Sequence, residues 1–285
     1  VSLCLIFKNE APFLKEWIDY HITIGVNHFY LYNNNSDDNF MEILQPYIKL
    51  GYITLTDWPY NKAQFAAYKH CYENYRYETN WLSFLDADEF FVPKYAISIS
   101  DWLKTFDKFP SIVVHWRIFG TGGVIHHNYN KNVIEQYFIC WDKFYQFGKC
   151  FINTRYNISS FNCWHVHHHT YMKYRIFGIL ISLPAVNQFG YICPVNYVYG
   201  GGNDLMKKST IMCNHYYTKA WDIYKQKMNK TDVLRGDNNP RSKMQQFYKM
   251  ENECVSTDYT ISRFFIRMRL FQQELNRYEE FKKNN

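Results

Sequence analysis

The sequence predicts an α/β fold with a parallel sheet at its centre, and three observations carry that prediction. In the first third of the chain, short apolar runs alternate with longer segments of helical spacing, as in consecutive βαβ units. A short aromatic run at 81–85 ends abruptly in carboxylates, which suits a buried strand better than a helix. Of the 285 residues, 47% are apolar and 20% aromatic, enough for one large domain or two small ones.

The first third of the chain divides into alternating strands and helices. The expected strands are 1–7, 28–32, 52–56 and 81–85. Between them we expect a helix that starts at Pro12 and that Gly25 closes, followed by helices at 40–50 and 64–77. A polar turn at 33–38 separates the second strand from the second helix.

After residue 92 the pattern is less regular. A short helix is expected at 101–106, strands at 111–119, 133–139, 149–153, 162–169 and 211–217, and helices at 219–229, 241–249 and 261–282. Residues 171–203 are rich in Gly, Pro and aromatics, so we expect an irregular insertion there. The last helix is amphipathic, and we expect it to dock on the core and not on a membrane.

The stretch 81–91 is the most informative part of the chain. If the strand extends through it, alternation places Asp86 and Asp88 on one face, where they would repel each other unless a cation lies between them. Mg²⁺ or Mn²⁺ suits two carboxylates, and ligands bind at the carboxyl ends of strands in open α/β sheets. A solvated acidic turn is the alternative, but the flanking apolar residues argue against it.

Composition limits the function classes. A net charge of +6 suits an anionic or nucleotide substrate and gives only a weak nucleic-acid signal, so we expect no nucleic-acid partner. No apolar run is long enough to span a bilayer. The 8 cysteines are scattered without a Cys-x-x-Cys pair, which favours reduced core cysteines and a cytoplasmic location. Because the chain begins within a strand-like run, we expect a domain cut from a longer protein; had an N-terminal anchor been removed, the Golgi lumen or a membrane-associated location would be the alternative.

Several stretches together resemble glycosyltransferase family 92 and its family 2-like relatives. They are CLIFKNE at 4–10, LKEWIDYH at 14–21, GVNHFYLY at 25–32, NSD at 35–37, the acidic stretch 81–90, Phe119-Gly120, His215-Tyr216, Lys227 and Arg235-Gly236. The resemblance spans most of the chain except the region around 171–203.

The resemblance implies a GT-A fold, which is a Rossmann-like nucleotide-sugar transferase fold with a mixed central sheet flanked by helices. It implies a catalytic domain over 1–218, with a nucleotide-sugar half at 1–92 and an acceptor half at 93–218, and a helical extension at 219–285. The implied activity is transfer of a sugar from a UDP-sugar to a hydroxyl of a glycan or glycoconjugate, with galactose as a guess for the sugar and inversion as the expected outcome.

In such enzymes the Asp-x-Asp motif binds a divalent cation on the donor diphosphate. Carried over, this makes Asp88 the direct ligand of Mn²⁺ or Mg²⁺, Asp86 a neighbour of the ribose or of a metal-bound water, and His215 a further ligand. For His215 a core histidine is the alternative. A denser group, His165 and 167–169, does not suggest zinc, because strand neighbours do not converge tetrahedrally.

Most of the remaining site residues follow the ends of the first two predicted strands, whereas Gln64 lies on a predicted helix and Lys219 and Arg235 are candidates for neutralising the diphosphate. The donor-binding candidates are Lys8, Asn9, Glu10, Asn34, Ser36, Asp37, Gln64, Asp86, Lys219 and Arg235. Polar turn and capping residues are the alternative reading for the Asn, Ser and Asp of this set. An inverting enzyme also needs a carboxylate base, for which the candidates are Glu135, favoured by the resemblance, Asp204 and Asp142. The competing function is a non-catalytic glycan-binding or scaffolding module that keeps the fold.

Overall fold

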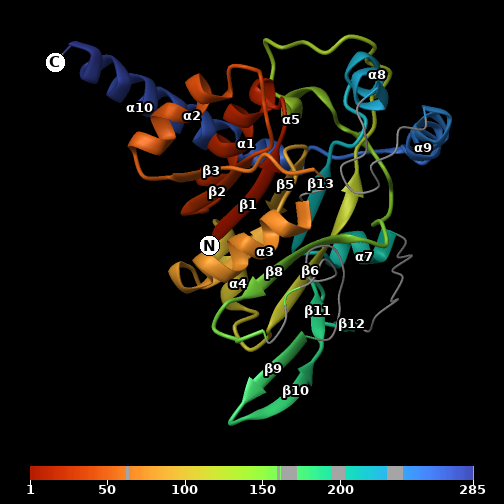
Figure 1. The fold of residues 1–285 in the computed structure, drawn as a ribbon. Coiled ribbons are helices and arrows are strands. Elements are labelled where there is room, and N and C mark those ends of the chain that lie inside the picture. Colours follow the sequence, from red (N-terminus) through yellow and green to blue (C-terminus); the bar gives the residue numbers. More distant parts are fainter. Residues whose placement is uncertain (62–63, 159–160, 162–171, 194–202, 230–239, 285) are drawn as a thin grey trace.

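A computed structural model describes residues 1–61, 64–158, 161, 172–193, 203–229 and 240–284. Its centre is a 10-stranded mixed sheet with helices packed on it (Figure 1). The predicted α/β class with a mixed central sheet is therefore confirmed.

The first third of the chain forms the parallel half of the sheet. Its elements are β1 Ser2–Phe7, α1 Ala11–Thr23, β2 His28–Asn33, α2 Phe40–Lys49, β3 Ile53–Asp57, α3 Gln64–Tyr75 with η1 Arg76–Glu78, and β4 Trp81–Phe84. The strands lie in the order β3-β2-β1-β4, and every neighbouring pair among them is parallel. Each predicted strand and helix of this region is present, with ends that differ by a few residues.

Alternation along β1 divides the apolar side chains between the two faces of the sheet. Leu3, Leu5 and Phe7 belong to a large core cluster that also contains Trp17 of α1. Cys4 instead belongs to a second cluster, together with residues of α3 such as Tyr68 and Cys71. Because α1 and α3 cover opposite faces, β1 is buried on both sides, as expected for a central parallel strand.

The second part of the chain adds strands in both directions, which makes the sheet mixed. These are β5 Glu89–Pro93, β6 Ser111–Ile118, β8 Gly148–Asn153, β11 Ala185–Asn187, β12 Ile192–Cys193 and β13 Ile211–His215. Strand β8 runs antiparallel to both β4 and β6, and β13 runs parallel to β6. Strands β1, β2, β4, β6 and β13 therefore all point in one direction, and their carboxyl ends meet at one edge of the sheet.

The remaining elements lie around this sheet. They are α4 Ile99–Lys104, α5 Val133–Gln136, β7 Ile139–Cys140, β9 Met172–Ile176, β10 Ile179–Leu183, α7 Asn203–Lys208, α8 Trp221–Asn229, α9 Pro240–Asn252, β14 Ser256–Thr257, η2 Thr260–Phe264 and α10 Phe265–Asn284. The hairpin of β9 and β10 projects from the lower end of the molecule in Figure 1.

Three expectations for the second part are wrong. Residues 133–139 are not a strand, because an Asn132 capping box starts a short helix there. The segment 171–203 is not wholly irregular, since it contributes a hairpin and two strands of the central sheet. Strand β5 was not expected at all: it begins at Glu89, directly after the acidic residues. The expected strand at 162–169 lies outside the described residues.

The long C-terminal helix packs on the nucleotide half of the predicted catalytic domain. Met268 is fully buried in the main core cluster, and Gln272 donates a hydrogen bond to Asp19 of α1 at 2.7 Å. Helix α10 thus docks on the core. Across the part of the chain that the structure describes, no helix is both long and apolar enough to cross a membrane.

Candidate functional site

The candidate site lies at the edge where the carboxyl ends of the parallel strands meet. Asp86 and Asp88 follow β4, Asn9 and Glu10 follow β1, Asn34 follows β2, and His215 ends β13. Polar groups from strands far apart in the sequence are therefore gathered at one edge, which is where α/β sheets bind ligands.

The acidic residues occupy a turn between two strands. Strand β4 ends at Phe84 and β5 starts at Glu89, so Asp86 and Asp88 lie in the connection. The expectation that a strand would carry both carboxylates on one face is therefore wrong. The turn sends the two side chains to different partners. The main-chain carbonyl of Asp88 accepts the Tyr216 N–H at 2.8 Å, which joins the turn to the end of β13.

Asp86 is held by a buried lysine. Lys149 Nζ lies 2.8 Å from Asp86 Oδ2, and its side chain is inaccessible to solvent. Gln64 and Tyr68, both on α3, each donate to Asp86 Oδ1 at 3.3 Å. Burial disfavours the ammonium, but Asp86 and Glu89 outweigh burial and raise the pKa of Lys149. Asp86 is therefore ion-paired with Lys149 but still accessible to solvent or a ligand, since its side chain remains 32% exposed.

Sheet geometry explains why Lys149 reaches the turn. Ser83 of β4 lies opposite Phe151 of β8, so Lys149, two residues earlier, lies beyond the end of β4. The preceding residue must be small, because a Cβ on Gly148 would collide with the Val114 carbonyl of β6. Close approach of β8 to β6 thus directs Lys149 into the acidic turn.

Asp88 faces a histidine and a second lysine. Its Oδ1 lies 3.6 Å from His215 Nε2, and its Oδ2 lies 3.3 Å from Lys227 Nζ of α8. Burial alone would raise the pKa of Asp88, but Lys227 and His215 hold that pKa well below its usual range. Burial lowers the pKa of His215 despite the nearby Asp88, so the imidazole is neutral at neutral pH. This pairs a carboxylate with an imidazole that retains a lone pair.

Glu89 lies beneath the acidic turn, on its core side, and contacts groups on both the Asp86 and the Asp88 side. It is fully buried, and its Oε2 accepts the Asp86 N–H at 3.0 Å and lies 3.2 Å from Lys149 Nζ. Its Oε1 lies 3.8 Å from His215 Nδ1. Burial raises the pKa of Glu89, and the Asp86 and Asp88 charges add to that effect while Lys149 opposes it. Glu89 therefore organises the turn from the core side.

The loops after β1 and β2 are joined to each other. Asn9 has a left-handed backbone at φ 55°, its N–H donates to Ser36 Oγ at 3.0 Å, and its Oδ1 accepts the Asp37 N–H at 2.9 Å. Asn34 donates to the carbonyls of Trp58 and Tyr60. Asn9, Ser36 and Asn34 thus shape these loops as turn residues do. Lys8 is exposed.

Two further candidates approach the acidic turn through their charges. Burial lowers the pKa of Lys227, whereas the charges of Asp88 and, more weakly, Glu10 raise it. Glu10 therefore lies near the Lys227–Asp88 pair. Lys219 has φ 50°, is 6% exposed, and its Nζ lies 4.2 Å from the centre of the Phe13 ring. Its charge also helps to lower the pKa of Asp88. The turn therefore lies in a basic environment.

Glu135, the favoured candidate base, has its described contacts outside this group. Glu135 accepts from the Asn132 N–H at the start of α5 and pairs with Arg269 of α10. Asp204 lies in α7, and nothing is described of its side chain. Arg235 and the histidines at 165–169 lie outside the described residues.

The geometry partly suits a divalent cation. No group of three or more His, Cys, Asp or Glu among the described residues is arranged to hold a metal. Asp88 Oδ1 and His215 Nε2 are 3.6 Å apart, close enough for one ion to take a ligand from each. The remaining positions would then fall to ligand oxygens and water. Lys149 Nζ already lies 2.8 Å from Asp86 Oδ2, and metal binding by Asp86 stays a prediction.

Sequence reasoning missed Lys149 and Tyr68 and gave Lys227 no role. Lys149 could have been recognised from the sequence, because it lies within the apolar strand Gly148–Asn153. A lysine in such a strand is buried, and a buried ammonium requires a carboxylate partner. For Lys227 the signal is weaker, because it lies on an amphipathic helix where a lysine is ordinarily solvated.

Comparison with known proteins places the chain in a family. Its aligned stretches are 44% identical over 89 residues to a Ricinus communis protein described as glycosyltransferase family 92, covering 31% of this chain and 15% of that protein. They are 29% identical over 120 residues to an Arabidopsis thaliana galactan beta-1,4-galactosyltransferase, covering 38% of this chain and 24% of that protein. Each alignment thus spans a minor part of its relative. A crystal structure of S. aureus TarS 1–349 with UDP-GlcNAc aligns with TM-score 0.39 and 8% identity over 88% of this chain and 71% of that one.

The match to a family is much broader than the alignments to the two plant proteins. The model of glycosyltransferase family 92 matches residues 1–249. This range includes the acidic turn and the two side chains that contact Asp88, those of His215 and Lys227. This chain belongs to glycosyltransferase family 92.

Proposed function

We propose that this chain is the catalytic part of a metal-dependent glycosyltransferase that moves galactose from UDP-galactose to a hydroxyl of a galactan-like glycan, with inversion. Membership of family 92 and the names of the galactosyltransferase relatives support the reaction class and the choice of sugar. The observation that carries the proposal is the Asp86–Glu89 turn, with its lysine and histidine partners, at the ligand-binding edge of the sheet.

The charges around the turn suit a diphosphate leaving group. Breaking the bond between the sugar and UDP increases negative charge on the diphosphate, so cations held nearby stabilise the transition state. Lys227 is 44% exposed and bound to Asp88 at 3.3 Å, so its ammonium is within the site and accessible to an anion. Lys219 and Arg235 are the further candidates for this role.

The metal in this proposal is Mn²⁺ or Mg²⁺, held by Asp88 and His215. When bound, such an ion neutralises charge on the donor diphosphate. The two protein ligands suit it, because one is an ionised carboxylate and the other a neutral imidazole. Glu89, on the Nδ1 side of the ring, would orient His215 so that Nε2 faces the ion. Asp86, fixed by Lys149, takes the role of a ribose or water neighbour.

The nucleoside would lie against the loops after β1 and β2. These loops present Lys8, Glu10 and Asp37 around a turn that Asn9 and Ser36 hold in shape. In this arrangement Asp37 accepts from the uracil ring N–H and Glu10 binds the ribose. Gln64 contributes by holding Asp86.

Two carboxylates remain candidates for the base that removes the acceptor proton. Glu135 has to leave its contact with Arg269 to act, because an ion-paired carboxylate is a weak base. Asp204 lies in α7, which directly precedes β13 in the chain. Comparing Glu135→Gln with Asp204→Asn would assign the base: the variant of the true base loses transfer while UDP binding is kept.

The first test is the binding of UDP to the purified chain, measured by isothermal titration calorimetry with and without Mn²⁺. We expect Mn²⁺ to strengthen UDP binding at least tenfold in the native chain and to have no effect in Asp88→Asn. Asp107→Asn, which changes a half-exposed carboxylate that pairs with Arg155 outside the acidic turn, is the matched control and should behave as the native chain. Binding of UDP that is indifferent to Mn²⁺, or that survives unchanged in Asp88→Asn, would refute the metal site.

A further inference from the structure

A second cleft lies away from the acidic turn. It has a volume of about 660 Å³ and is lined by residues of α4, the segment after β5, the segment after β11 and the residue before β13. Thr210 lines it directly before β13 starts, whereas His215 ends that strand. At about 3.3 Å per residue the two positions are roughly 16 Å apart, so this cleft is separate from the acidic turn.

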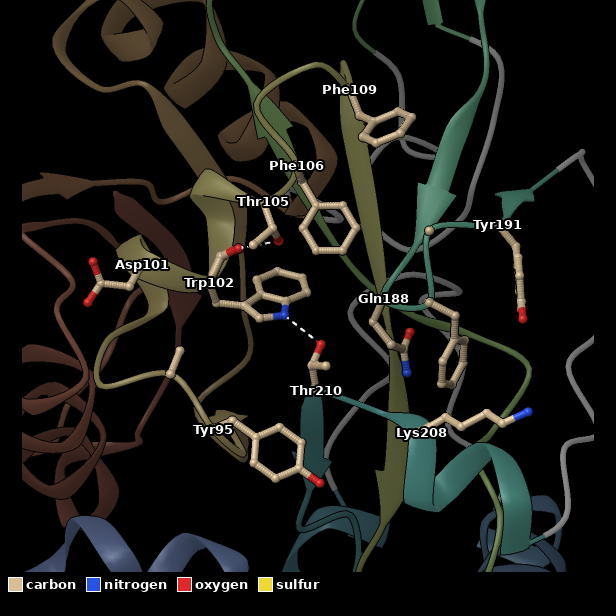
Figure 2. Close-up of a pocket in the computed structure, with 13 residues that line it drawn as sticks. Tyr95, Asp101, Trp102, Thr105, Phe106, Phe109, Gln188, Tyr191, Lys208 and Thr210 are labelled. Atoms are coloured by element: carbon tan, nitrogen blue, oxygen red, sulfur yellow. Dashed lines mark hydrogen bonds between the residues drawn. The ribbon is translucent and has the colours of Figure 1, made fainter.

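Aromatic side chains account for 6 of the 13 described residues that line the cleft. Tyr95 and Tyr191 lie on opposite sides of the cleft, with Gln188 between them (Figure 2). These tyrosines are 71% and 51% exposed, so much of each ring is available to a ligand. Trp102 is fixed deeper in the wall, because its indole N–H donates to Thr210 Oγ1 at 2.8 Å. Exposed rings next to fixed ones offer flat apolar surfaces with polar tips.

A buried amide lies in the wall of this cleft. Gln188 is 2% exposed, and its Oε1 accepts the His115 N–H at 3.1 Å. Its Nε2 is inaccessible to solvent and, among the residues that the structure describes, has no acceptor. Gln188 therefore forms part of the wall, and the exposed Tyr95 and Tyr191 are the polar-tipped side chains that a ligand can reach.

The charges of the cleft favour a neutral ligand. Among the described residues that line it, Asp101 and Lys208 are the only ones with charged side chains, and they have opposite signs. The Asp101 carboxylate is already bound by Lys104 at 2.8 Å and by the Ser98 hydroxyl at 2.8 Å. The lining therefore has no excess charge to select a phosphorylated or strongly anionic molecule.

We propose that this cleft binds a segment of a neutral glycan, at a distance from the acidic turn. Sugar rings pair apolar C–H faces, which pack on tyrosine and tryptophan rings, with hydroxyl groups, which form hydrogen bonds with hydroxyls such as those of Tyr95 and Tyr191. The volume suits a few sugar units. The choice of a glycan rests on the proposed glycosyl transfer, and the cleft would hold a part of the acceptor that does not react.

The test measures direct binding, so that it does not depend on transfer. Neutral tetrasaccharides of β-1,4-linked galactose, β-1,4-linked glucose and α-1,4-linked glucose are titrated calorimetrically into the native chain, into Asp88→Asn and into a Tyr95→Ala/Tyr191→Ala double variant. We expect at least one tetrasaccharide to bind the first two proteins alike and the double variant at least tenfold more weakly. Tyr248→Ala, which removes a tyrosine that is 57% exposed on α9, is the matched control and should bind as the native chain does.

Each contrary result separates this inference from the proposed function. Equal binding to the native chain and the double variant, or no binding of any tetrasaccharide while UDP still binds, would overturn the cleft proposal alone. Loss of tetrasaccharide binding in Asp88→Asn but not in the double variant would assign the glycan to the acidic turn instead. Unchanged UDP affinity and thermal unfolding of the double variant establish that it is folded.

Discussion

Lys149 is the residue on which the acidic turn depends most. Its ammonium is inaccessible to solvent and lies 2.8 Å from Asp86 and 3.2 Å from the fully buried Glu89. Removing one partner of a buried ion pair leaves an uncompensated charge, which is far more costly than losing an exposed pair. The turn is therefore a stability feature as well as a site for a ligand.

Replacing Lys149 with methionine should lower the free energy of unfolding by about 3–5 kcal/mol, because the buried carboxylates lose their cation. Lys143→Met is the matched control, since Lys143 pairs with Glu253 at 2.7 Å with both side chains well exposed. That change should cost less than about 1 kcal/mol. Urea unfolding of both variants at pH 7 makes the measurement, and equal losses would contradict the role given to Lys149.

From the sequence, one can predict which residues lie at the site better than one can predict which side chains contact them. Asp88 and His215 were predicted as neighbours through the family resemblance, and they do lie 3.6 Å apart. Lys149 was not predicted, because its approach depends on the register of β8 against β4 and on Gly148, which only the paired strands reveal. The separate directions of Asp86 and Asp88 were also missed, since alternation holds only while the chain remains a strand.

At the scale of elements, Glu16 joins α1 to α5. Its two carboxylate oxygens accept the N–H groups of Val133 and Ile134 at 2.7 and 2.9 Å, at the start of α5. Burial raises the pKa of Glu16 to about 7, although these hydrogen bonds oppose the shift. The contact accounts for the helix at 133–136, where the sequence had indicated a strand.

This raised pKa predicts how stability depends on pH. The folded chain keeps a proton on Glu16 up to about pH 7, whereas the unfolded chain loses it near its ordinary value of 4.5. The contribution of Glu16 to stability is therefore full below pH 4.5 and is lost as pH rises to 7, by about 3 kcal/mol. Glu16→Gln should flatten this part of the profile in urea unfolding between pH 4.5 and 7.5. An identical slope in the variant would exclude Glu16 as its source.

Helix α10 offers a direct test of docking. Met268 is fully buried against the core, while Leu270 on the same helix is 52% exposed. Met268→Ala should therefore cost about 2–5 kcal/mol, and Leu270→Ala no more than about 0.5 kcal/mol. Thermal or urea unfolding of the pair measures the difference. Similar small effects would mean that the helix is not part of the cooperative core.

Over the whole molecule, the fold was more predictable than the site. The regular alternation of strand and helix up to residue 85 predicted the parallel half, because β1, β2 and β4 are buried on both faces and read as apolar runs. The later strands are short or belong to antiparallel and edge positions, as β11 and β12 do, so their sequence pattern is weak. The division into 1–218 and 219–285 stays a prediction.

The same sheet places two distinct surfaces at opposite ends of β13. One end has the acidic turn, where Lys227 and His215 surround Asp88. The other end has the aromatic cleft beside Thr210. In the proposed function the first surface binds the nucleotide sugar and the second holds a distant part of the glycan, which gives an enzyme acting on long acceptors two points of attachment.

Transfer itself is the most direct test of the central claim. The native chain, Asp88→Asn and Asp107→Asn are incubated with UDP-galactose, Mn²⁺ and a β-1,4-linked galactotetraose, and the pentasaccharide product is measured by mass spectrometry. The account predicts product with the native chain and with Asp107→Asn, and at least a hundredfold less with Asp88→Asn or in EDTA. Full product formation by Asp88→Asn would contradict it, as would the absence of product with the native chain under conditions where UDP binds.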